Sequence, residues 1–243
     1  MSSSPRLEPE LSIEEIRRTG PLVDAIYADI LSPSFPPAEL TTLAALRAGI
    51  TAGTTTVAVA LDAARTPWGA AVGEWYPEAR VMLLGYMAAR PGNRGLGVGR
   101  ELLAQSIRAW AGRYAPCLVL AEVERPDAHR ASLAHGDPTA RLRFYQRYGA
   151  RALDLPYFQP ALRADEERAY GMLLITLHAE DRFLIGPDLL DAAPVRAFWA
   201  DYLAGTEGRV DDPAATRLRD AMRRDGIRLR PLDEYRRVPA AAG

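Results

Sequence analysis

The sequence contains no lysine, so arginine provides all 30 of its basic side chains. These are offset by 31 acidic residues, which leaves a formal net charge of −1. Nucleic-acid-binding domains usually carry a marked excess of positive charge, so the composition gives no indication of a nucleic-acid partner. The missing lysine also excludes the phosphate-binding P-loop, in which the glycines are followed by Lys and then by Ser or Thr.

Cysteine is almost as scarce, since Cys117 is the only one in 243 residues. A single cysteine excludes an internal disulfide and suits a reducing compartment. No apolar run is long enough to cross a membrane, and residues 1–9 lack the apolar core of a signal peptide. We therefore expect a cytoplasmic protein with no membrane partner, in which residues 1–9 form a disordered lead.

What is present is an ordinary globular mixture, 48% hydrophobic and 25% charged. A first strand is expected at LSIEEIRR, followed by helical spacing in PLVDAIYADIL and PPAELTTLAALRAG. Further segments rich in apolar or β-branched residues are predicted as strands, namely TTTVAVALDA, WGAAVGEWY, RVMLLGYMAA, CLVLAEV, ALDLPYF and YGMLLITLH. This mixed order favours an α+β fold over a uniform doubly wound sheet.

Several helices are indicated in the middle and at the end of the chain. One is expected from about residue 100 to 114, directly after a glycine-rich loop. Another has Asp137 as its N-cap and Pro138 at its first position, and it ends before Gly149. Residues 179–243 differ in character and are expected to form a helical C-terminal extension, with helices near 193–204 and 213–225.

The glycine-rich stretch AARPGNRGLGVGRELLAQ, residues 88–105, joins a predicted strand to a predicted helix. Backbone amides at the start of a helix bind phosphate groups. The dinucleotide pattern G-x-G-x-x-G does not fit, because its third glycine would fall on Arg100. Glu122 lies about where a ribose-binding acid would be, so an NAD(P)-dependent oxidoreductase is kept as a weaker alternative.

The same stretch satisfies the pattern Arg/Gln-x-x-Gly-x-Gly at residues 94–99, with Pro91 ahead of it and ELL after it. Together with the helix ARLRFYQRYGA further on, it closely resembles the GNAT superfamily of N-acetyltransferases. The resemblance covers roughly residues 10–178. It implies an acyl-CoA-binding catalytic domain over this range, built on a central mixed, mostly antiparallel sheet flanked by helices.

The resemblance also implies an acyl donor, most naturally acetyl-CoA, and the place where it binds. No metal is expected in the site. The glycines let the backbone approach the pyrophosphate, and the helix start donates amide N–H groups to it. The strand before the loop would pair with the pantetheine arm, and one of its amides can polarise the thioester carbonyl. The coenzyme-binding residues implied in this way are Met87, Ala88, Ala89, Arg94, Gly95, Leu96, Gly97, Val98, Gly99 and Arg100.

Acyl transfer to an amine needs a base for the ammonium and an acid for the departing thiolate. By resemblance, the acid is Tyr145, which follows Phe144. The segment LAEV is similar to the strand in which some family members place a catalytic glutamate, and this indicates Glu122. Glu124 is the alternative because it shares the same strand face, and a water chain is a third possibility.

The acceptor is expected to be the primary amine of a small molecule, attacking directly in a ternary complex, because no activated Ser or Cys nucleophile is evident. Tyr157 and Gln159 of PYFQP are expected in the acceptor wall. The His residues of the loop 125–137 match no zinc spacing. Glu74 and Glu78 either attract a cationic amine or are ordinary polar residues of a hairpin, and we favour the second.

Two questions stay open at the level of sequence. The extension contains an apolar stripe that either packs on the core, forms a homodimer contact or covers the acceptor site, made of Val195, Phe198, Trp199 and Tyr202. A non-catalytic CoA-binding sensor or scaffold is the alternative function. Such a protein is expected to lack the candidate acid and bases, whereas this sequence has all of them.

Overall fold

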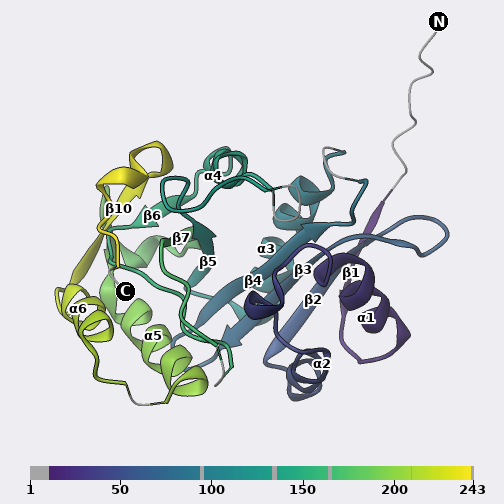
Figure 1. Cartoon of the computed structure of the whole chain (residues 1–243), viewed down its shortest axis with the longest axis horizontal. Helices are drawn as coiled ribbons and strands as arrows, with labels where there is room; N and C mark the ends of the chain where they lie inside the picture. The colour runs from purple at the N-terminus through teal and green to yellow at the C-terminus, as the bar shows by residue number, and fades with distance from the viewer. Residues whose placement is uncertain (1–10, 94–95, 133–135, 164–165, 209, 242–243) are drawn as a thin grey trace, which may run out of the picture.

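The structure is a computed structural model that describes residues 11–93, 96–132, 136–163, 166–208 and 210–241 (Figure 1). The expected disordered lead over residues 1–9 lies outside this range. One sheet runs through the molecule in the strand order β1-β2-β3-β4-β5-β7-β6-β10-β9-β8. The strands are β1 (Ser12–Ile16), β2 (Thr55–Leu61), β3 (Pro67–Tyr76), β4 (Val81–Ala89), β5 (Leu118–Glu124), β6 (Arg151–Leu153), β7 (Met172–Ala179), β8 (Leu184–Gly186), β9 (Leu189–Asp191) and β10 (Gly226–Pro231).

Helices cover both faces of this sheet. The α-helices are α1 (Pro21–Ile26), α2 (Leu43–Ala52), α3 (Val98–Tyr114), α4 (Pro138–Gln146), α5 (Ala192–Thr206) and α6 (Pro213–Ala221). Shorter helical turns are η1 (Tyr27–Leu31), η2 (Pro37–Glu39), η3 (Asp181–Phe183) and η4 (Leu232–Arg237). No helix within the described residues combines the length and apolarity needed to cross a membrane.

The end signals of α4 are confirmed. The side chain of Asp137 accepts a hydrogen bond from the Thr139 amide at 2.8 Å, and Pro138 occupies the first turn, where its missing N–H leaves no bond unmade. The chain leaves the helix through Gly149 at a φ of +72°, a conformation that favours glycine. These local signals place Tyr145 in the last turn of a helix with fixed ends.

Two segments differ from the sequence predictions in their extent. PPAELTTLAALRAG forms the turn η2 and then a helix that begins only at Leu43, because the Thr42 side chain caps it by accepting a hydrogen bond from the Ala45 amide. ALDLPYF is a strand only as far as Leu153. Beyond it, Tyr157 forms an isolated bridge with Ala240.

The C-terminal extension contains the expected helices α5 and α6, but it also contains three strands that the sequence analysis missed. Along β10, Ile227 and Leu229 are buried while Arg228 between them is exposed, the alternation of a half-buried strand. This strand pairs antiparallel with β6, and β9 pairs with it on the other side. The extension therefore lengthens the central sheet.

Among the strand pairs of the described residues, only β4 and β5 run parallel. This confirms the mixed, mostly antiparallel sheet expected from the sequence. A doubly wound dinucleotide-binding fold needs a mostly parallel sheet, so the topology does not fit the oxidoreductase alternative.

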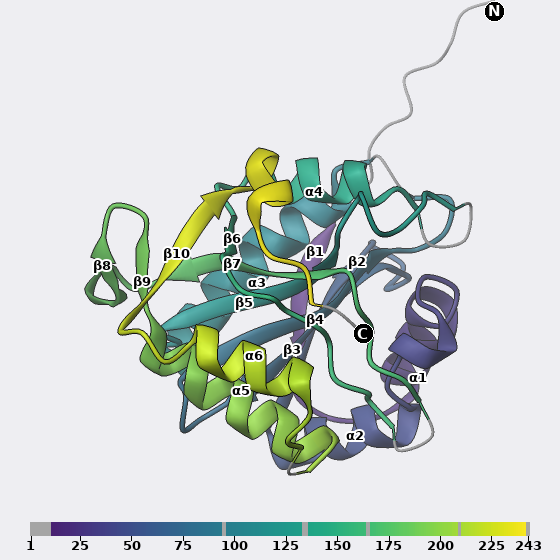
Figure 2. The same cartoon turned by 60° about the vertical axis from the view of Figure 1, so that its left-hand side comes forward.

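The helices divide between the two faces of the sheet in a way that matters for the site. Helices α3 and α4 pack on one face, around a core that includes Trp110 and Leu142. Helices α1 and α2 cover part of the other face around Ile26 and Leu46. Helices α5 and α6 cover the rest of that face farther along, around Phe198 (Figure 2).

The apolar stripe of α5 packs inside the molecule, since its four members are 0 to 4% exposed and share one core with residues of β4 and β5. We expect Phe198→Ala to lower the free energy of unfolding of the whole chain by about 3 to 5 kcal/mol in a single transition. Chemical denaturation of both proteins measures this. Arg217→Ala, at an exposed position of α6, is the control and should change stability by less than about 0.5 kcal/mol. A separate early transition in Phe198→Ala would show that the extension unfolds by itself.

Candidate active site between the parting strands

The site begins where β4 and β5 separate. Their parallel pairing joins Val81–Leu84 to residues 118–121, whereas β4 continues to Ala89 and β5 to Glu124. The register between β3 and β4 shifts at the same level, so Gly85 forms a bulge that turns the rest of β4. Backbone N–H and C=O groups of β4 beyond the bulge thus face a gap in the sheet instead of a neighbouring strand.

A cavity of about 270 Å³ opens beside this free edge, and we call it the helix-end cavity. It is lined on one side by Met87, Ala88 and Ala89 of β4, and on the other by Gly99 and Tyr145. Three of the predicted coenzyme-binding residues of β4 and one of the glycine loop therefore lie around one cavity.

The N-terminus of α3 borders the helix-end cavity. Gly97 is its N-cap at a φ of +77°, and no side chain among the described residues caps the helix. The amides of Arg100 and Glu101 both bond to the Gly97 carbonyl. The amides ahead of them are those of the first turn, where a helix carries its partial positive charge, so this end of the cavity suits an anion.

The other predicted loop residues have different positions. Val98 is 2% exposed and is wedged against β3, since a Cβ at Gly69 would come within 2.8 Å of it. Leu96 is partly buried in the core under α3, and Arg100 is exposed on the first turn of that helix. Arg94 and Gly95 lie outside the described residues.

Tyr145 projects from α4 into the space between the parting strands. It lines the helix-end cavity and also a second, narrower cavity, which we call the carboxylate cavity because Glu122 and Glu124 line it. Burial raises the pKa of Tyr145 to about 12, although the nearby Arg141 acts in the opposite direction. The phenol therefore keeps its proton throughout the physiological range, and no hydrogen bond among the described residues uses its hydroxyl.

Glu122 lies at the centre of a set of neutral hydrogen-bond donors. Its Oε1 accepts a bond of 2.6 Å from the Tyr157 hydroxyl, while Oε2 accepts bonds from Gln159 Nε2 at 3.0 Å and from the Tyr202 hydroxyl at 3.3 Å. Burial raises the pKa of Glu122 to about 7, with a further contribution from Glu74, and the three donors only partly offset this.

Glu124 has a different environment on the same strand. It accepts a hydrogen bond of 2.8 Å from Arg141 of α4, and His129 Nδ1 lies 3.6 Å from its other oxygen. The two candidate bases thus differ in their partners: Glu124 is bound to a cation, whereas Glu122 is held by uncharged groups.

Two residues of this site were given other roles in the sequence analysis. Tyr202 was assigned to an apolar stripe, and its ring is indeed buried, but its hydroxyl reaches Glu122. Glu74 was interpreted as an ordinary hairpin residue, yet burial raises its pKa and the Tyr76 hydroxyl bonds to it at 3.3 Å. The only feature of the sequence that could have indicated a special role for Glu74 was the position of a carboxylate within the long, largely apolar strand β3.

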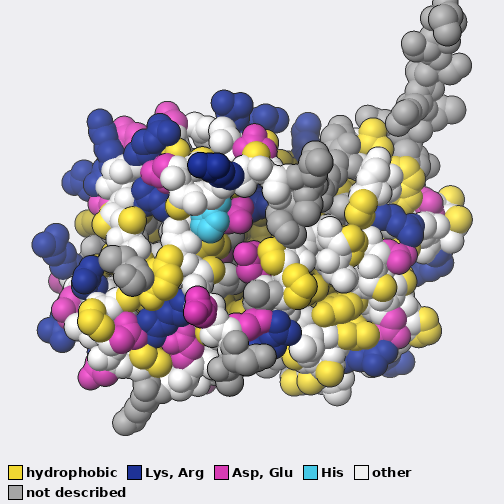
Figure 3. Space-filling model, viewed as in Figure 1, with side chains coloured by type: hydrophobic (Ala, Val, Ile, Leu, Met, Phe, Trp, Pro, Cys, Tyr) yellow, Lys and Arg dark blue, Asp and Glu magenta, His cyan; other side chains and the backbone are white. Residues whose placement is uncertain are grey.

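The predicted acceptor residues have mixed positions. Tyr157 is 1% exposed and Gln159 lines the carboxylate cavity, and both donate hydrogen bonds to Glu122. In the described part of the chain, no group of three His, Cys, Asp or Glu side chains could hold a metal ion. Acidic and basic side chains are intermingled over the face drawn in Figure 3.

Comparisons with known proteins agree with this architecture. No family model and no curated protein matches the sequence. Among solved structures, a protein of Bacteroides thetaiotaomicron that is assigned to the GNAT family of acetyltransferases is 21% identical, with a TM-score of 0.52, covering 74% of this chain and 89% of its own. The Escherichia coli ribosomal-protein-S18-alanine N-acetyltransferase is 17% identical, with a TM-score of 0.48 and coverages of 69% and 93%. The likeness to the Bacteroides protein shows that the chain has the fold of GNAT acetyltransferases.

The raised pKa of Glu122 makes stability depend on pH. The folded state binds this proton more tightly than the unfolded chain does. The free energy of unfolding is therefore highest below pH 4.5, the ordinary pKa of the group, and it falls as the pH rises from there through about 7. Glu122→Gln removes this titration. Between pH 5 and pH 8, we expect the free energy of unfolding of the variant to rise by about 2 kcal/mol relative to that of the wild type, as measured by urea denaturation.

The control for this experiment is Glu78→Gln, at an exposed carboxyl in the turn between β3 and β4. It is expected to follow the wild type at both pH values. A difference in stability between Glu122→Gln and the wild type that stays constant with pH would contradict the raised pKa of Glu122.

Proposed function

We propose that the protein is an acyl-CoA-dependent N-acyltransferase that transfers an acetyl group from acetyl-CoA to a primary amine of a small molecule. One observation carries this proposal. The gap between β4 and β5 has a helix N-terminus with a glycine N-cap at one end and a partly buried carboxylate with a raised pKa at the other, and Tyr145 lies between them. The shared fold with GNAT acetyltransferases supports it.

The helix-end cavity suits the donor. The first turn of α3 offers backbone amides to the pyrophosphate, and Gly99 leaves room for it because it has no side chain. The edge of β4 at Met87, Ala88 and Ala89 offers N–H and C=O groups to the amide-containing pantetheine arm. One of these N–H groups can also polarise the thioester carbonyl.

Glu122 acts as the general base. A carboxyl with a pKa of about 7 is ionised in half of the molecules at neutral pH and is basic enough to accept a proton from an ammonium. The amine then attacks the thioester carbonyl carbon with its lone pair. A C–N bond forms, the C–S bond breaks, and its electron pair leaves on sulfur.

Tyr145 acts on the sulfur. Its phenol is protonated at every pH at which the enzyme would work, so it can donate a hydrogen bond and then a proton to the departing thiolate. The balance is closed in this way: of the two protons that the ammonium nitrogen loses, one passes through Glu122 to solvent. The other restores the Tyr145 hydroxyl, which gave its own proton to the thiolate of coenzyme A.

The coenzyme site can be tested with two glycines of the same helix. Gly99 lines the helix-end cavity, whereas a Cβ at Gly112 would meet nothing within 4 Å and the residue is exposed. We expect Gly99→Leu to weaken acetyl-CoA binding at least about tenfold, because the new side chain fills the place of the ligand. Isothermal titration calorimetry measures this, and Gly112→Leu should bind as the wild type does. Equal affinities of the two variants would exclude this cavity as the coenzyme site.

The catalytic roles can be separated by kinetics. For the wild type, kcat/KM is expected to rise with pH and to level off above about 7, as Glu122 loses its proton. Glu122→Gln should lower kcat about a hundredfold and remove the rise of kcat/KM with pH. Tyr145→Phe should lower kcat by a similar factor, but its kcat/KM should still rise with pH. Release of coenzyme A from acetyl-CoA with an amine panel provides the assay.

Glu124→Gln decides between the two carboxylates in the same assay. If it, instead of Glu122→Gln, removes the rise with pH, the base is Glu124. Acetyl-CoA binding without turnover of any amine would favour the non-catalytic coenzyme-binding alternative.

A further inference from the structure

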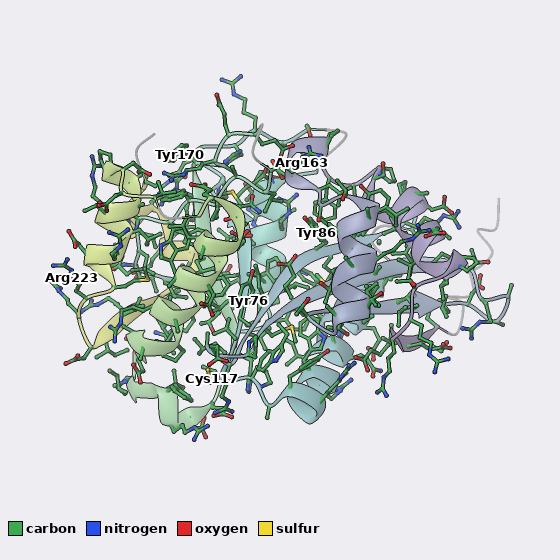
Figure 4. The ribbon with its side chains drawn as sticks, turned by 90° about the horizontal axis from the view of Figure 1, so that it is seen from below. Tyr76, Tyr86, Cys117, Arg163, Tyr170 and Arg223 are labelled. Atoms are coloured by element: carbon green, nitrogen blue, oxygen red, sulfur yellow. The ribbon has the colours of Figure 1, made fainter. Side chains whose placement is uncertain are left out.

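A third cavity, of about 420 Å³, lies between α2 and α5 on the sheet face opposite to α3, and we call it the α2–α5 cavity. Tyr76 and Tyr86, which line it, lie between these two helices (Figure 4). Tyr86 also lines the carboxylate cavity. Tyr202 lines the α2–α5 cavity and donates its hydroxyl to Glu122. The cavity thus adjoins the proposed base.

The charged lining of the α2–α5 cavity is acidic. It contains Glu74 and Asp201, and none of the described residues that line it is Arg, Lys or His. No ion pair among the described residues uses either carboxyl group. A concave surface of this kind attracts cations.

Glu74 is the informative member of the pair. Its Oε2 accepts a bond from Tyr76, whereas its Oε1 has no hydrogen-bond partner among the described residues. Oε1 reaches toward the bulge in β4, 3.6 Å from where a Cβ of Gly85 would lie, and Gly85 lines the carboxylate cavity. Glu74 therefore lies between the two cavities. The Glu74 side chain is partly buried, and this burial raises its pKa, which disfavours the charged form. A cation that arrives with a ligand would stabilise the carboxylate.

The remaining lining is suited to a hydrocarbon chain. Leu46, Val72 and Leu162 provide apolar surface around the two carboxyl groups. A ligand with an alkyl chain can bury it there, and each CH₂ group removed from water favours binding. Alkyl surface between carboxylates matches a chain of methylene groups that ends in ammonium groups.

We propose that the acceptor is an aliphatic amine with a second cationic group, and that the α2–α5 cavity holds this group. The inference rests on the proposed acyltransferase function. The reacting nitrogen lies beside Glu122 in the carboxylate cavity, and the distal ammonium is bound by Glu74 and Asp201. The distal group keeps its charge and its protons throughout, so the reaction at the first nitrogen is balanced as described above.

The test uses sets of three amines that differ only at the far end of the chain. In the five-carbon set these are 1,5-diaminopentane, 5-amino-1-pentanol and n-pentylamine, with corresponding sets of three to six carbons. With acetyl-CoA as donor, we expect kcat/KM for the diamine of the best length to exceed that of its alcohol and alkyl counterparts at least about tenfold. A ratio near one at every length would overturn the inference.

Two variants locate the preference. Glu74→Gln and Asp201→Asn should each reduce the diamine-to-alkylamine ratio about fivefold or more, since each removes one charge-assisted contact to the distal ammonium. Asp220→Asn removes an exposed carboxyl of α6 outside the cavity, where it pairs with Arg223, and it should keep the wild-type ratio. A ratio that falls equally in all three variants would indicate only an effect of net charge, and would contradict the cavity as the site.

Binding measurements separate this inference from the proposed function. Acetyl-CoA should raise the unfolding temperature of the wild type, and calorimetric titration of the diamine into protein saturated with free coenzyme A should show binding that Asp201→Asn weakens. Absence of acetyl-CoA binding would sink the acyltransferase proposal. Acetyl-CoA binding and amine turnover without diamine binding or preference would leave that proposal standing and reject the dicationic acceptor.

Discussion

The separation of β4 from β5 is the constraint on which the rest of the site depends. A strand inside a sheet normally has all its backbone groups paired, and unpaired buried groups are unfavourable. Here the ladder stops at Leu84 and Ala121, and the bulge at Gly85 turns β4 away. The open edge is tolerated because cavities lie along it, which give its N–H and C=O groups access to water or to a ligand. The same break brings α3, α4 and α5 to one place.

The second feature is the balance of forces at Glu122. Three hydrogen bonds favour its charged form, and bonds of this kind alone would lower its pKa. The pKa is nevertheless raised, so burial together with the neighbouring Glu74 outweighs them. An arginine beside Glu122 would have lowered its pKa. The surroundings of Glu122 instead keep the carboxyl near the midpoint of its titration at neutral pH, and a group perturbed in this way is a candidate for proton exchange.

The sequence predicted much of the fold and about half of this arrangement. Local signals were sufficient where they are strong, as at Asp137 and Gly149 around α4, and the glycine loop indicated the start of α3. They were insufficient for β10, whose alternation is short and follows a helix. They also could not show that Tyr202 reaches Glu122, because this contact joins residues 80 positions apart. Contacts of this kind follow from the order of strands in the sheet, not from neighbouring residues.

The two glutamates of β5 show how one strand can give similar side chains different tasks. Glu124 is paired with Arg141, which lies one helical turn before Tyr145 on α4. The ion pair therefore joins the end of β5 to the helix that carries the proposed acid. Glu122 faces uncharged donors from the loop after β6 and from α5. Two carboxyl groups whose surroundings differ in this way are suited to different roles. In the proposed mechanism Glu124 fixes the geometry and Glu122 exchanges the proton, and the surroundings of both depend on segments that reach the strand only in the folded chain.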